Sequence, residues 1–341
     1  MRMSYAELFK RALLVVVVAL VPFLIWYLFD VILMAFGAII LAMVLRLGAE
    51  PFSRWLAIPR SVALIASGLL ALAVAGGVGY LFGTLISREL QDVINRASAA
   101  EQIIQAKMHG SELGELFLTR MTREDFSITG ILEKFFTVST GFLGALLVLV
   151  ISAIYLAAQP ELYRQDLIKL FPLRLHAQAT KKIDHIGNTL RLWIIGQLIQ
   201  MALIGVLSGL AAWIIGLPSA IALGLIAFAA EFVPYLGPII AAVPAVLVAA
   251  TINTTALLWT IAAYVIIHQI EGNLFTPLIQ RRLVLVPPAV MLRGIVAISL
   301  LFGPPAVIFA APIVVVVFVA VKVLYVRDTL GEDTEIPGES S

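Results

Sequence analysis

The sequence predicts an all-α polytopic membrane protein. Of its 341 residues, 61% are hydrophobic and 13% are charged, whereas soluble domains carry about 25% charged residues. The mean hydropathy is +1.04, and long uncharged runs recur at about the length that a helix needs to cross a bilayer. Too little polar surface remains to cover a water-soluble protein, which excludes a soluble enzyme, a nucleic-acid binder and a disordered chain.

The sequence contains eight long apolar runs, which predict about eight transmembrane segments. The two longest runs carry prolines and glycines in their middle and are expected to be broken helical hairpins, because each flank is too short for a full crossing. In chain order the runs are Ala12–Phe29, Val31–Leu45, Ser61–Ile86, Phe136–Ala158, Trp193–Ile215, Ser219–Ala250, Thr255–Ile267 and Leu283–Val321.

Residues 1–86 are expected to form an N-terminal part of three membrane helices. The first run follows Arg2, Lys10 and Arg11, as the apolar part of a signal peptide would. It is too long for one, however, and no small-residue cleavage site precedes the next run. We therefore expect a retained helix, joined to the second run by a tight turn at Asp30.

Loop charges predict both termini on the cytoplasmic side of the membrane, because Lys and Arg concentrate in cytoplasmic loops. Basic residues lie at the N-terminus, after the second run and near the C-terminus. Residues 159–192 carry six basic residues against three acidic ones and are expected inside. Residues 87–135 carry six basic and eight acidic residues and are expected outside.

Three segments outside the spans have a composition of their own. Residues 87–135 have apolar residues at helical spacing and are expected to form a small external amphipathic module. This module is a lid or an oligomer contact, or alternatively a substrate-binding domain. In residues 136–192 the fourth membrane helix precedes an amphipathic helix whose basic face suits the anionic inner leaflet. The acidic tail, 328–341, is expected to be disordered.

Residues 193–327 are expected to form a transport core with an inverted repeat, 193–252 and 254–327. Each half is a simple span followed by a broken segment, and the loop charges give the two simple spans opposite directions. Inverted repeats with breaks at corresponding positions indicate the binding site of a secondary transporter. The alternative is a pair of proline-kinked hairpins with no role in transport. The matching positions are Pro218 and Pro288, Gly224 and Gly294, Phe232 and Phe302, Pro234 and Pro304, and Pro244 and Pro312.

From Trp193 to Val321 the only charged residues are Glu231, Glu271, Arg293 and the boundary pair Arg281 and Arg282. A charge at bilayer depth costs about 2.5 kcal/mol or more, so it usually faces protein or water and serves a function. Glu231 precedes the break at Pro234, where freed backbone groups can bind an ion, and its burial suits a proton carrier. Alternatively, its carboxylate only holds the fold together, paired with Arg293 or with backbone donors.

A polar cluster follows the span Thr255–Ile267. His268 and Gln269 are expected to form a polar gate near the inner surface, beside Glu271 and Asn273. His268 and Glu271 lie three residues apart and share a helix face. Two ligands are too few to indicate a metal site, so neither a metal nor a cofactor is predicted. Gln197, at the start of the fifth run, is expected at the membrane interface.

Signatures of catalysis are missing from the sequence. It has no GxSxG elbow, no HExxH motif and no P-loop, which argues against an enzyme and against ATP-driven transport. It has no cysteine, which excludes disulfides and thiolate metal sites. The net charge of +2 indicates no nucleic-acid partner.

Three motifs resemble those of the autoinducer-2 exporter family, also called PerM-type permeases. They are EFVPYLGPIIAAVP at 231–244, EGNLFTPLIQ at 271–280, and LFGPPA at 301–306 followed by Ala311 and Pro312. The resemblance covers nearly the whole chain. It departs from the family pattern at Arg293, where an apolar or small residue is usual. The residues that carry over are Glu231, Pro234, Tyr235, Gly237, Pro238, Glu271, Asn273 and Pro277.

The resemblance implies about eight membrane segments, both termini inside, and a homo-oligomer with a pentamer as the candidate assembly. It also implies export of a small solute. Our first hypothesis is therefore a secondary transporter that exports a small polar molecule, autoinducer-2 or a related signal, coupled to an ion or a proton. The alternatives are a sodium (lithium)/proton antiporter that uses the same carboxylates, and an oligomeric membrane scaffold that transports nothing.

Overall fold

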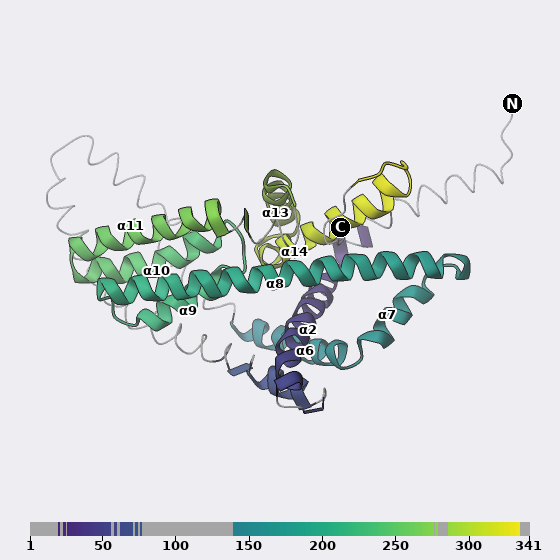
Figure 1. The fold of residues 1–341 in the computed structure, drawn as a ribbon, viewed down its shortest axis with the longest axis horizontal. Helices are drawn as coiled ribbons and strands as arrows, with labels where there is room; N and C mark the ends of the chain where they lie inside the picture. The colour runs from purple at the N-terminus through teal and green to yellow at the C-terminus, as the bar shows by residue number, and fades with distance from the viewer. Residues whose placement is uncertain are drawn as a thin grey trace.

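The computed structural model describes residues 20, 23–24, 26–55, 58–59, 62–70, 72–73, 76, 139–275, 277–278 and 286–334, and every element in them is helical (Figure 1). The predicted external module, 87–135, lies outside these residues, as do the first 19 residues and the end of the tail. The elements are α2 (Phe29–Trp55), α6 (Ser139–Ala158), α7 (Pro160–Lys169), η2 (Leu173–Leu175), α8 (His176–Ile215), α9 (Ala220–Ala230), α10 (Gly237–Ile252), α11 (Thr254–Ile270), η3 (Glu271–Phe275), α13 (Pro288–Phe302), α14 (Pro304–Val321) and η4 (Lys322–Arg327).

Three helical stretches of the described chain are long and apolar enough to cross a membrane: Phe29–Pro51, Leu173–Ile215 and Ala306–Arg327. Shorter apolar helices accompany them: Leu147–Ala158, Ala220–Ala230, Gly237–Ile252 and Pro288–Phe302. Large apolar side chains are exposed on almost every helix, including Trp213, Ile221 and Leu300. Exposed apolar surface of this extent fits contact with lipid. The all-helical membrane class is thus observed, while the number of eight crossings stays a prediction.

Helix α8 is the longest element, with 40 residues, and α9, α11 and α14 pack against it (Figure 1). The sequence predicts an amphipathic helix before residue 193 and a membrane span after it, and the structure joins the two without a break. Arg191, near the middle of α8, forms an ion pair of 2.9 Å with Glu50 of α2. The helix ends at Gly216, whose left-handed conformation (φ 83°) allows its N–H to bond the last carbonyls of the helix.

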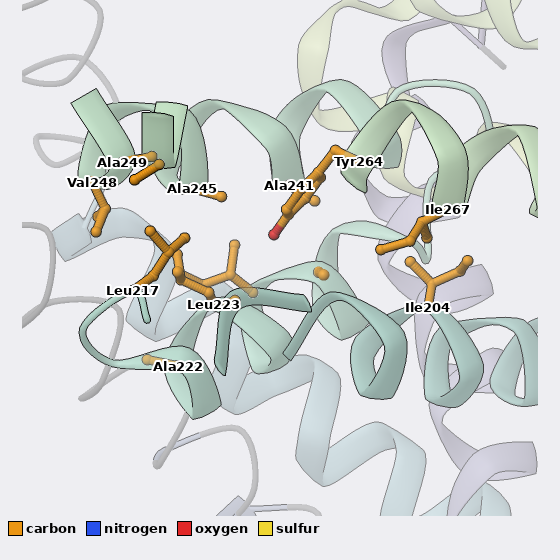
Figure 2. Packing of buried hydrophobic residues seen from close by; sticks show 14 residues of the cluster. Ile204, Leu217, Ala222, Leu223, Ala241, Ala245, Val248, Ala249, Tyr264 and Ile267 are labelled. Carbon is orange, nitrogen blue, oxygen red and sulfur yellow. The ribbon is translucent and has the colours of Figure 1, made fainter. Parts of the chain in front are cut away.

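The C-terminal half of α8 packs with α9, α10 and α11 in one apolar cluster, which we call the α8–α11 unit (Figure 2). Small side chains let α8 and α9 approach closely. A Cβ atom built on Gly224 of α9 would lie 2.7 Å from the carbonyl oxygen of Gly205 and 3.0 Å from the Cα of Gly209, both on α8. Backbone contact of this kind needs glycine and is typical of helix pairs in membranes.

A second apolar cluster joins the middle of α8 to α2, α13 and α14. Ile40 of α2, Ile194 of α8 and Val315 of α14 are buried in it. Helix α6 packs on the other face of α2 through alanines such as Ala38 and Ala153. Helix α8 therefore takes part in the packing of both helical groups.

Both proline-containing segments are broken near the predicted positions. The first divides into α9 and α10 around residues 231–236, and the second divides into α13 and α14 at Gly303, which has a φ of 81°. Pro244 and Pro312 instead lie inside α10 and α14. The relation of the two pairs by an axis in the membrane plane stays a prediction.

The predicted disordered tail begins with an ordered contact. Asp328, its first residue, forms an ion pair with Lys182 of α8, and Arg327 donates a hydrogen bond to the carbonyl of Thr334. Residues 335–341 lie outside the described part of the chain.

Candidate functional site

Glu231 lies at the break between α9 and α10 and is only 1% exposed. The backbone around it is tightly constrained. A Cβ atom on Gly237 would lie 2.7 Å from the carbonyl oxygen of Ala230 and 2.8 Å from the Cα of Glu231, so only glycine lets α10 begin there. Tyr235, between them, has a φ of 67°, which is uncommon for a residue with a side chain. Strained backbone of this kind often lies at functional sites.

Helix α11 presents a polar stripe to the inside of the α8–α11 unit. Thr260 and Tyr264 are buried, and His268 and Glu271 follow at spacings of four and three residues, which place all four on one helix face. Figure 2 shows Tyr264 pointing from α11 into the packed cluster. The opposite face of α11 carries exposed apolar residues such as Val265. The stripe therefore runs through an otherwise apolar region.

Glu231, His268 and Glu271 come together where the break meets the end of α11. One potential ligand atom of each lies within 4.8 Å of those of the other two. The Nδ1 atom of His268 lies 2.7 Å from Oε2 of Glu271. A π-helical turn, η3, begins at Glu271. Such turns are rare and are frequent at functional sites, because they redirect side chains within a helix.

Helix α8 adds further buried polar groups to this region. The amide of Gln197 donates a hydrogen bond of 2.6 Å to the backbone carbonyl of Glu231. Gln200 and Ser208, further along α8, are also buried. The site thus draws on three segments of the chain that are far apart in sequence.

Unpaired polar atoms concentrate in this region. Five buried side-chain atoms of the described chain lack a hydrogen-bond partner, and four of them belong to Ser208, Glu231, Tyr264 and His268. Buried polar atoms are almost always hydrogen-bonded, and each exception calls for an explanation such as water, an ion or a ligand. The α8–α11 unit therefore holds buried polar groups inside an apolar shell, as a path for a polar solute or ion requires.

The structure separates the remaining predicted site residues. Gln269 and Asn273 are exposed, and the Asn273 amide donates to the carbonyl of Gln269. The predicted gate is therefore divided, with His268 turned inward and Gln269 outward. Arg293 is exposed on α13 and, although the structure describes both residues, forms no ion pair with Glu231. Pro234 and Pro238 flank the strained turn, in which Tyr235 is 46% exposed.

Sequence reasoning missed several polar members of the site. Gln197 was expected at the membrane interface but is buried against the break, because α8 continues through the predicted span boundary. Ser208 and Tyr264 did not stand out because isolated hydroxyl groups are common in membrane helices. The signal that finds Tyr264 is its spacing of four and seven residues from His268 and Glu271.

Replacing Gln197 by leucine is expected to lower the free energy of unfolding by about 1–3 kcal/mol, the usual cost of stranding a buried hydrogen-bonding group. The lost bond leaves the Glu231 carbonyl without its donor. Thermal unfolding of the protein in detergent measures the change. Gln269→Leu, on the exposed face of α11, is the matched control and should change stability little. Equal losses in both variants would contradict the structural role of Gln197.

The chain is similar to known proteins along most of its length. The model of the family described as AI-2E family transporter matches residues 13–326. YueF of Bacillus subtilis, which its name assigns to transport, is 23% identical over 76% of this chain and 75% of its own length. YrrI of the same organism, also assigned to transport by name, is 32% identical, but the match spans only 46% of this chain and 45% of YrrI. The AI-2 transport protein TqsA of Escherichia coli is 22% identical over 84% of this chain and 83% of its own length.

Proposed function

The chain belongs to the AI-2E family of transporters, and we propose that it is a secondary transporter that exports a small polar solute through the α8–α11 unit. The name of TqsA makes autoinducer-2 the first solute to test. We place the protein in the bacterial inner membrane with both termini in the cytoplasm, as the loop charges predict. We also propose that it acts as a homo-oligomer.

One observation carries this proposal: a helix break with a buried carboxylate faces a polar stripe inside apolar helices. Glu231 at the break and Glu271 at the end of the stripe lie close together. Ionisable groups at this depth are expensive and usually mark a substrate or ion pathway. Broken helices supply the unpaired backbone groups with which secondary transporters bind substrates and ions.

The proposed roles follow from position. Glu231 and Glu271 hold the positive charge of the coupling ion, because two facing carboxylates in an apolar surrounding need a proton or another cation between them. Tyr264 and Ser208, whose buried hydroxyl groups lie inside the apolar cluster, offer hydrogen bonds to the polar solute. Gln197 holds the break in place through the Glu231 carbonyl.

Flux measured in proteoliposomes tests the proposal. Vesicles containing the purified protein and loaded with autoinducer-2 should release it faster than vesicles without protein, and an ion or pH gradient should change the rate. Parallel vesicles should report sodium and proton movement. Sodium–proton exchange without release of the solute would contradict the proposed export, as would the absence of any flux from correctly folded protein.

A further inference from the structure

The cluster of Glu231, His268 and Glu271 has the composition of a metal site. Its three candidate ligand atoms lie within 4.8 Å of one another. The sequence alone offered only His268 and Glu271, three residues apart on one helix face. The break between α9 and α10 adds a third candidate ligand, Glu231, which lies 37 residues before His268 in the sequence.

The His268 ring is oriented as a metal ligand requires. Its Nδ1 lies 2.7 Å from Oε2 of Glu271. Two ligand atoms that each lie about 2.0–2.2 Å from one ion are about 3 Å apart. Nδ1 of the neutral ring and Oε2 of Glu271 are therefore close enough to bind one ion as neighbouring ligands.

Glu231 supplies a second, independent observation. Its side chain is 1% exposed, and its Oε2 has no hydrogen-bond partner among the described residues. An ionised carboxylate at this depth is costly unless a proton or a metal ion neutralises it. His268 and Glu271 are also well covered, with 17% and 12% of their side chains exposed. The ligands therefore face one another inside the protein, unlike an acidic cluster on a surface.

We propose that Glu231, His268 and Glu271 bind a divalent first-row transition-metal ion such as Mn²⁺, Co²⁺ or Zn²⁺. One imidazole and two carboxylates match the donor preference of these ions. Mg²⁺ and Ca²⁺ prefer a shell of oxygen atoms only, and Cu⁺ prefers sulfur. Three protein ligands leave coordination positions open for water or for a polar group of a solute. This inference goes beyond the proposed function, because metal binding is measured without transport.

Metal binding by the full-length protein in detergent tests the proposal, after removal of any affinity tag. Titration with Mn²⁺, followed by the loss of the free-ion electron paramagnetic resonance signal, should show one tight site per chain. Glu231→Gln and His268→Gln should each weaken binding at least about tenfold, as loss of a ligand or its support does. His185→Gln is the matched control: His185 also has a buried, unpaired Nε2 but lies outside the cluster. It should bind Mn²⁺ as the wild type does.

A spectroscopic measurement on the wild type keeps the test decisive even if a variant does not fold. Bound Mn²⁺ should show magnetic coupling to one imidazole nitrogen. The proposal is overturned if the wild type binds no Mn²⁺, Co²⁺ or Zn²⁺ stoichiometrically, if the bound ion shows no nitrogen coupling, or if folded His268→Gln binds as tightly as the wild type. Solute flux measured on the same preparation separates the two proposals, because lost export with intact metal binding contradicts only the proposed function.

Discussion

Glu231→Gln is expected to abolish transport while the protein stays folded. Glutamine keeps the shape of the side chain and can still occupy its buried position beside α11, but it removes the negative charge that holds a cation there. The structure shows no ion pair between Glu231 and Arg293, so the substitution leaves no buried arginine without a partner. Flux should fall at least about tenfold, which corresponds to about 1.4 kcal/mol of lost interaction.

Proteoliposome flux and thermal unfolding, measured on the same preparations, check this result. Glu231→Asp should retain partial activity, because it keeps the charge on a shorter side chain. Glu161→Gln is the matched control, since Glu161 is exposed on α7 and its ion pair with Arg164 is a surface pair of little weight. A folded Glu231→Gln protein with wild-type flux would remove Glu231 from the transport path.

Gly224→Val is expected to destabilise the fold severely. Even a Cβ atom at this position would meet the backbone of Gly205 and Gly209 at 2.7–3.0 Å. Rigid helix backbone cannot move aside as a flexible side chain does, so α9 must separate from α8. Overpacking typically costs about 1–3 kcal/mol, and contact with backbone places this variant at the upper end or beyond. Gly224→Ala should be intermediate.

Thermal unfolding and size-exclusion chromatography in detergent measure the effect. Gly187→Val in α8 is the matched control, because no atom lies within 4 Å of a Cβ built there. Its change should stay within about 1 kcal/mol, the range of helix propensity. Similar losses in Gly187→Val and Gly224→Val would show that β-branching, and not the helix contact, decides stability.

The helical class and the positions of the two breaks were predictable because local chemistry determines both. Composition alone indicates membrane helices, and clustered prolines and glycines favour a break in a helix. Both proline-rich segments divide near Pro234 and Pro304 for this reason. The prolines at 244 and 312 show the limit of the rule, since they lie inside continuous helices.

The composition of the site was only partly predictable because it depends on contacts between distant segments. Glu231 and Glu271 stood out as charges in apolar sequence, but nothing local indicates that they meet. Gln197 was misplaced because a helix can leave the bilayer without any change in its backbone. Arg293 looked like a partner for Glu231 by charge, yet it lies on the exposed side of α13. Such pairings are decided by tertiary packing.

The uninterrupted course of α8 has a mechanical consequence. At about 1.5 Å per residue, its 40 residues extend about 60 Å, roughly twice the thickness of a bilayer's hydrocarbon core. A large part of α8 must therefore project from the membrane or lie strongly tilted in it. The end near residue 182 is attached to Asp328 by an ion pair, and the other half holds the Glu231 carbonyl through Gln197. Because α8 continues without a break between these two contacts, we expect a displacement at its charged end to shift the backbone at the break where the carboxylates meet.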